Sequence, residues 1–275
     1  MENVKENNSV PGEVIGLPVS SIVYPLLISL YGETKKGKTY TGASFPNAIL
    51  LDLPPVKMGF GKVEMDKAAL TRTVGEGFRS LFSPQKRDSG IVWVPKIAGF
   101  DYKTQYVFIK SWKEFQEAIG KARVFSELMP EEQGKTWIVI DDTYRWRGLE
   151  VVNWQSKNSG KWPAAPQFGQ ITQQMQAELT DIQEFANVLL ISRMVRDFDT
   201  GVYVAQVHPS GIDYLADASL EILTEIRDNK QVQVIKVHSN GHEKSWDNPN
   251  VCKEIVSPKS PSEILEKLKI PKTLW

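Results

Sequence analysis

The sequence predicts an α/β fold with a mostly parallel, doubly wound sheet that gains antiparallel strands in its C-terminal part. Four short, nearly continuous apolar runs are separated by segments of helical periodicity, and beyond Arg193 apolar and polar residues alternate instead. Continuous apolar runs are typical of strands buried on both faces of a parallel sheet. Strands that alternate with helices are typical of doubly wound domains.

The expected elements follow one another in a simple order. The apolar runs predict parallel strands at 26–32, 47–53, 136–142 and 187–193. Helical periodicity predicts helices over 111–125, where Ser111 and Glu114 are spaced as a capping box, and over 167–185. The alternating segments 201–208, 218–226 and 230–238 predict antiparallel strands or a hairpin. A last helix is expected after Ser260, with Pro261 at its first position.

Composition limits the classes of protein that this chain can be. We expect an N-terminal tail over 1–21, one domain over 22–256 and a C-terminal helix and tail over 257–275. Residues 54–104 have little periodicity and predict an irregular insertion within that domain. The formal net charge is zero, which excludes a global electrostatic attraction to nucleic acids or membranes. The single cysteine, Cys252, excludes an internal disulfide, and this is typical of a soluble cytoplasmic protein.

Residues 32–39, GETKKGKT, have the glycine, lysine and threonine spacing of a phosphate-binding loop. Glycines allow the backbone to turn successive N–H groups toward an anion, and the following helix presents its positive end. The loop follows an expected buried strand and precedes a short helix, and this is the context that the motif requires. A lysine-rich surface turn is the alternative. The candidate nucleotide-binding residues are Gly32, Glu33, Thr34, Lys35, Lys36, Gly37, Lys38, Thr39 and Tyr40.

Acidic residues end two of the expected strands. The run WIVIDD places Asp141 at the carboxyl edge of a parallel strand, where open α/β sheets bind ligands. Thr39 and Asp141 are therefore the candidate ligands for Mg²⁺, and Lys38 the residue that reaches the β- and γ-phosphates. Asp142 and Asp52 are alternative candidates for the carboxylate that activates water, and the sequence does not choose between them. Asp142 is also a candidate N-cap of the next helix.

Arg193 ends the fourth expected strand and lies at the same edge of the sheet. Its guanidinium is a candidate for contact with the γ-phosphate, and Ser192 and Arg196 are further candidates. A solvated arginine beyond a strand is the simpler alternative.

Several stretches resemble a known family. LYGETKKGKTYTGASFPNAILLD, WIVIDDTYRW, FGQITQQMQAELTDIQEFANVLLISR and DYLADASLEI are similar to segments of RecA-like phage nucleotide-binding proteins of the AAA type. The resemblance covers most of residues 26–240. It implies a RecA-like P-loop fold and a Mg²⁺-dependent ATPase that binds ATP, assembles as a homo-oligomer and acts on single-stranded DNA. A role in viral or mobile-element recombination, in the host cytoplasm, would follow.

The same resemblance implies basic residues that reach a neighbouring subunit's site, for which Arg227, Lys230 and Lys236 are candidates. The main alternative function is a nucleotide-binding regulatory or DNA-packaging module with little hydrolysis. A nucleotide kinase is less favoured, because no arginine cluster predicts a lid. A GTPase is disfavoured too, because the guanine-binding Asn-Lys-x-Asp pattern is missing.

Overall fold

The computed structural model describes residues 25–54, 56–59, 62–65, 82–87, 90–95, 105–128, 135–197, 199–210, 212, 215–240 and 252–275. The expected N-terminal tail and much of the expected insertion lie outside these residues. No helix among the described residues is long and apolar enough to cross a membrane.

The described residues form a sheet of eleven strands. Its middle six strands are mutually parallel, in the order β11 (Ala218–Arg227), β1 (Leu27–Gly32), β9 (Asn187–Arg196), β8 (Trp137–Asp141), β2 (Ala48–Asp52) and β7 (Gln105–Phe108). Antiparallel strands extend both edges, with β12 (Lys230–Asn240) and β13 (Glu254–Val256) beyond β11, and β6 (Gly90–Pro95) and β5 (Phe82–Arg87) beyond β7. β10 (Tyr203–Gln206) pairs with the end of β9.

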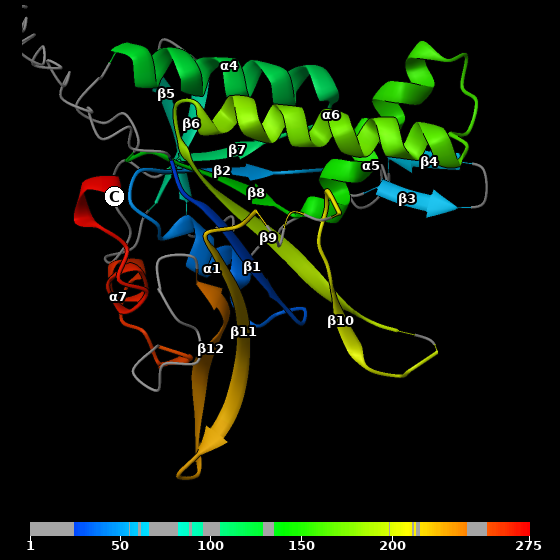
Figure 1. Ribbon diagram of the computed structural model, residues 1–275. Coiled ribbons are helices and arrows are strands. Elements are labelled where there is room, and N and C mark those ends of the chain that lie inside the picture. Colours follow the sequence, from blue (N-terminus) through cyan, green and yellow to red (C-terminus); the bar gives the residue numbers. More distant parts are fainter. Residues whose placement is uncertain are drawn as a thin grey trace, which may run out of the picture.

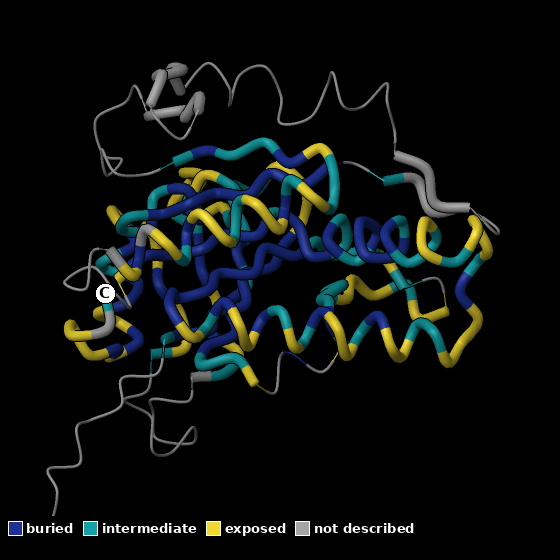
Figure 2. The backbone as a smooth tube through the Cα atoms, turned by 90° about the horizontal axis from the view of Figure 1, so that it is seen from above, coloured by how far each residue is buried: buried dark blue, intermediate teal, exposed yellow. Residues whose placement is uncertain are grey.

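Helices cover both faces of the sheet (Figure 1). One face carries α4 (Trp112–Leu128), α5 (Thr143–Lys157) and α6 (Ala165–Gln183), and the other carries α1 (Lys38–Ala43) and α7 (Pro261–Lys267). A short 3₁₀ helix, Lys272–Leu274, follows α7. Each face packs into its own hydrophobic core, so the sheet is buried between two apolar layers. Figure 2 shows this as a dark blue centre surrounded by helices with exposed outer faces.

Local sequence signals explain where the helices begin. The capping box predicted at the start of α4 is confirmed, since the Glu114 amide donates to Ser111 Oγ at 3.2 Å. Ser260 caps α7 in the same way, accepting from the Glu263 amide at 3.3 Å. These polar groups satisfy backbone donors that the first helical turn leaves without partners.

Three parts of the chain differ from the prediction. Residues 54–104 contain regular elements rather than irregular chain alone, namely β5, β6 and a separate hairpin of β3 (Val56–Gly59) and β4 (Lys62–Met65). Helix α5 was expected only as the helix that Asp142 would cap, and its extent was not predicted. β11 pairs antiparallel with β12 as expected, but it also lies parallel to β1, which makes it a central strand.

The predicted fold class is confirmed. The chain forms an α/β domain with a mostly parallel sheet and antiparallel strands added in its C-terminal part. The strand that precedes the phosphate-loop motif, β1, lies between β11 and β9, and the acidic strand β8 is the next one along. The carboxyl ends of these strands therefore gather the candidate residues at one edge of the sheet.

Candidate functional site

The GETKKGKT segment connects β1 to α1 at the carboxyl edge of the sheet. The Lys38 side chain folds back over this loop, and its ammonium donates to the carbonyl oxygens of Gly32 at 2.8 Å and Glu33 at 2.7 Å. Burial lowers the pKa of Lys38, while the nearby Asp141 and Asp142 carboxylates oppose that effect. The loop thus holds a partly buried cation at its centre, as a phosphate-binding loop requires.

Gly37 is needed for the shape of the loop. Its φ of 94° lies in the left-handed region, which favours glycine. A Cβ at this position would also lie 2.8 Å from Gln233 Nε2. The same Gln233 amide donates to the Lys36 carbonyl at 3.3 Å, so strand β12 contacts the loop directly.

Thr39 and Asp141 are brought together at the start of α1 and the end of β8. The Thr39 hydroxyl donates a short hydrogen bond to Asp141 Oδ2. Burial raises the pKa of Asp141, and the adjacent Asp142 carboxylate adds to the rise. The Thr39 hydroxyl and the Asp141 carboxylate therefore provide oxygen atoms of the kind that bind divalent cations, beside a second carboxylate.

Asp142 is the N-cap of α5, the structural role that the sequence left open for it. Its Oδ1 accepts from the Arg145 amide at 2.9 Å. Its Oδ2 accepts from Arg193 Nη2 at 2.6 Å and lies 3.7 Å from Arg145 Nε. Both carboxylate oxygens are therefore bound by cationic or backbone donors.

Asp52, the rival candidate, lies deeper. Its side chain is 1% exposed, against 12% for that of Asp142. The Tyr106 hydroxyl donates to Asp52 Oδ2, and Arg145 Nη1 lies 3.3 Å from Asp52 Oδ1. In the parallel register Asp52 is the direct neighbour of Asp141, so the acidic residues of β2 and β8 meet at the same edge.

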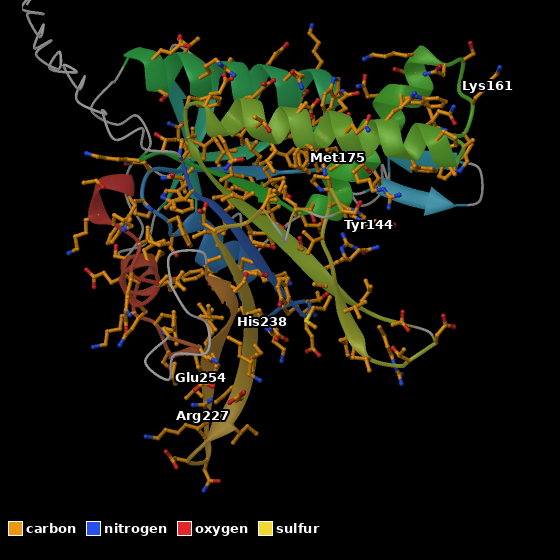
Figure 3. The ribbon with its side chains drawn as sticks, in the orientation of Figure 1. Tyr144, Lys161, Met175, Arg227, His238 and Glu254 are labelled. Atoms are coloured by element: carbon orange, nitrogen blue, oxygen red, sulfur yellow. The ribbon has the colours of Figure 1, made fainter. Side chains whose placement is uncertain are left out.

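Arg193 lies beside the loop because β9 and β1 are neighbours, and its register partner is Gly32. Its guanidinium is paired with Asp142 and lies 4.6 Å from the centre of the Tyr144 ring. Figure 3 shows Tyr144 at the start of α5, close to β9 and β10. The fully buried Ser192 does not face solvent, since its hydroxyl is 2.7 Å from Thr143 Oγ1. Arg196 instead donates to the Gly201 carbonyl at 3.1 Å, in the turn between β9 and β10.

The basic residues of hairpin β11–β12 do not reach the loop within this chain. Arg227 pairs with Glu225 at 2.6 Å and with Glu254 at 2.9 Å, low on the hairpin (Figure 3). Lys236 lies 3.7 Å from Glu225. Lys230 is exposed where the hairpin turns. The hairpin that carries these residues projects beyond the helices (Figure 1).

Sequence reasoning missed two residues of this site, Arg145 and Gln233. Arg145 stands three positions after the N-cap Asp142, and this spacing was the available signal for a contact between them. Gln233 carries no local signal, because its contact with Lys36 depends on how β12 is placed in the sheet.

Comparison with known proteins found matches among solved structures alone. Neither a family model nor a curated protein matches the chain. A solved structure described as a KaiC-like protein, PH0186, from the hyperthermophilic archaeon Pyrococcus horikoshii OT3 matches with a TM-score of 0.40 and 10% sequence identity. The match covers 86% of this chain and 90% of that chain.

Proposed function

We propose that the protein is a Mg²⁺-dependent ATPase whose nucleotide lies on the loop between β1 and α1. One observation carries the proposal, namely that the loop surrounds the Lys38 ammonium while the Thr39 hydroxyl meets the Asp141 carboxylate. Lys38 can exchange its two carbonyl partners for phosphate oxygens. The loop amides, from Gly32 to Tyr40, would bind the same phosphates.

Thr39 and Asp141 fit a magnesium ion. A hydroxyl and a carboxylate are ligands that Mg²⁺ prefers. Burial, and after it the adjacent Asp142 carboxylate, raises the pKa of Asp141, and a divalent cation would offset both effects. A bound Mg²⁺ supplies charge neutralisation for the β- and γ-phosphates. No group of three or more metal-binding side chains occurs among the described residues, so waters and phosphate would complete the coordination.

We assign Asp142 rather than Asp52 as the carboxylate that orients water. Asp142 is close enough to influence the pKa of Lys38, and its side chain is more exposed than that of Asp52. Arg193, released from Asp142, would contact the γ-phosphate from its place beside Gly32. Asp142 would then accept the proton of the attacking water as a general base.

The wider role follows from the resemblance to RecA-like phage proteins. We propose a homo-oligomer that acts on single-stranded DNA in viral or mobile-element recombination, built from one domain over 22–256 with the C-terminal helix beside it. Because Arg227 and Lys236 are paired within their own chain, Lys230 is the favoured residue for reaching a neighbouring subunit.

Purified protein with the substitution Lys38→Ala tests the ATPase. We expect nucleotide affinity to fall about tenfold or more, and turnover to fall to background, because the loop loses its central cation. Lys36→Ala is the matched control, since Lys36 belongs to the same loop but its ammonium lies 3.7 Å from Glu33 at the surface. ATP binding that is indifferent to Lys38→Ala would contradict the proposal. Turnover measured with and without single-stranded DNA tests the DNA role.

A nucleotide-binding regulatory or packaging module is the second candidate function. One observation favours it, because both oxygens of Asp142 are bound by Arg145 and Arg193. Tight ATP binding without turnover, under conditions where Lys38→Ala abolishes binding, would support this second function instead.

A further inference from the structure

Arg145 is the side chain that contacts both candidate carboxylates. Asp52 comes from the end of β2 and Asp142 follows β8, so nothing in the local sequence joins them. From the first turn of α5, Arg145 places Nη1 at 3.3 Å from Asp52 and Nε at 3.7 Å from Asp142. The same Nη1 donates to the Leu53 carbonyl at 3.1 Å, which fixes the guanidinium against the end of β2.

The partners of Arg145 differ from those of Arg193 in one important respect. Arg193 has one carboxylate partner and is stacked on Tyr144, so a phosphate can draw it away. Arg145 is bound on one side to the buried Asp52 carboxylate and to the Leu53 carbonyl, and separating a buried ion pair is costly. Arg145 therefore stays in place when Arg193 moves.

The shape of the guanidinium explains how one residue can do this. Its N–H groups point in fixed, diverging directions in one plane, so Nη1 and Nε can serve two acceptors at once. A lysine ammonium could compensate the charge of Asp52, but it has no planar fork that spans both carboxylates.

We propose that Arg145 is a positioning residue that holds Asp142 in line for water activation by tying it to Asp52. This role rests on the proposed ATPase function. Once Arg193 has exchanged Asp142 for phosphate, the Arg145 amide and Nε are what keep the Asp142 carboxylate oriented. Tyr106 and Leu53 secure the other end of the link, through Asp52 and Arg145 respectively.

Arg145→Lys separates positioning from simple charge compensation. We expect kcat for ATP to fall about 10- to 100-fold, because small misplacements of a catalytic group have effects of this size. KM, the Kd for a fluorescent ADP analogue measured without Mg²⁺, and Tm should stay near those of the parent protein, since charge and loop are intact. Asp52→Asn, which weakens the other end of the link and leaves Asp142 and Arg145 in place, serves where the lysine variant does not fold, and the same fall in kcat is expected.

Arg147→Gln is the control on the same helix. Its guanidinium lies 5.2 Å from the centre of the Phe168 ring, against α6, and we expect unchanged kcat. A kcat for Arg145→Lys within about twofold of the parent would overturn the proposal, as would equal losses of kcat and nucleotide binding. If the parent protein itself does not hydrolyse ATP, the proposed function fails and this role fails with it. An active parent protein with an equally active Arg145→Lys variant would instead overturn the role of Arg145 alone.

Discussion

At the scale of single residues, Gly37 shows how a sequence motif becomes a backbone requirement. Its left-handed conformation, with φ of 94°, opens the loop around Lys38. Any other L-residue in this conformation would bring its Cβ too close to the following carbonyl oxygen. The position of this glycine in the motif is therefore required by the backbone dihedral angles of the loop as well as by phosphate binding.

Gly37→Ala should lower the free energy of unfolding by about 1–2 kcal/mol, the cost of placing an alanine in the left-handed region. The added Cβ would also push Gln233 Nε2 away from the Lys36 carbonyl. Urea denaturation monitored by tryptophan fluorescence measures the change. Gly120→Ala in α4 is the control, since nothing lies within 4 Å of its added Cβ. That substitution should leave stability equal or raise it by up to about 1 kcal/mol. An equal response at both glycines would contradict the argument.

The residues of the site were predictable where the signal is contiguous. The loop, Asp141 and Asp142 form two short runs beside buried strands, and backbone geometry fixes what such runs do. Arg145 could not be predicted in its bridging role, because Asp52 lies 93 positions away along the chain. Only the pairing of β2 with β8 brings the two carboxylates together.

At the scale of elements, α5 shows why the extent of one helix could not be predicted from the sequence. Its buried side includes Glu150 and Asn153 as well as Leu149 and Val151, so the apolar periodicity is interrupted. Helix prediction from sequence depends on an unbroken apolar stripe. Because polar residues lie on the packed face, the sequence of α5 lacks the apolar periodicity that would indicate its length.

Glu150 is the most unusual of these buried residues. It is 1% exposed and lies next to Glu178 of α6. Burial, reinforced by Glu178, raises the pKa of Glu150 to about 10, and burial also raises the pKa of Glu178. Two carboxyl groups in this position share a proton, because two adjacent charges without a cation would be strongly unfavourable.

This pair should make the protein less stable as the pH rises. From the ordinary pKa of 4.5 toward about 10, the folded Glu150 holds a proton that the unfolded chain has lost. Raising the pH therefore favours unfolding over this range. Glu150→Gln keeps the shape and the donor of the protonated group without titrating. We expect the variant to have a higher Tm than the parent at pH 8, by a few degrees, since about 1 kcal/mol corresponds to about 2–4 °C.

Melting curves at pH 5 and pH 8 measure this effect, and the gain from Glu150→Gln should shrink at pH 5. Glu117→Gln is the matched control, because the Glu117 side chain is 52% exposed on α4 and pairs with Lys113 at 3.7 Å. An exposed pair contributes little to stability. A Glu150→Gln variant with the pH dependence of the parent would show that the pair does not hold its proton.

At the scale of the whole molecule, the C-terminal segment belongs to the main core. Buried side chains from α7 and the turn after it join the cluster formed by β1, β9, β11 and β12, namely Ile264, Leu265, Leu268 and Ile270. They cover a face of the sheet that would otherwise be open to water. The expected C-terminal helix is thus structural rather than an appendage.

A chain that ends at residue 257 should therefore lose much of its stability. Burial of one large aliphatic side chain contributes about 1.5–3 kcal/mol, so loss of four approaches the total stability of a typical domain. Thermal unfolding and binding of a hydrophobic dye measure the outcome, and we expect a broad transition at lower temperature with dye bound before heating. Glu266→Ala in the full chain is the control, because that exposed side chain pairs with Lys272 at the surface. A truncated chain with an unchanged Tm would place α7 outside the cooperative unit.

The sequence was sufficient to predict the four strands β1, β9, β8 and β2, and insufficient to place the strands beside them. Four apolar runs became four neighbouring parallel strands, because burial on both faces leaves a strong local signature. No such sequence pattern indicates that β11 lies beside β1. Its alternating residues fit a hairpin with β12, and that pairing is also present.

Gly32 has a consequence beyond this protein's own chemistry. A Cβ there would lie 2.3 Å from the Ile222 carbonyl oxygen, so the close approach of β1 and β11 alone requires glycine. A descendant that no longer needed a nucleotide would still retain Gly32 for its sheet. The backbone of the loop sets the same kind of limit on Gly37, whereas Lys38 could then be replaced freely. Among related chains, loss of Lys38, rather than survival of the glycines, would therefore mark the point at which nucleotide binding was lost.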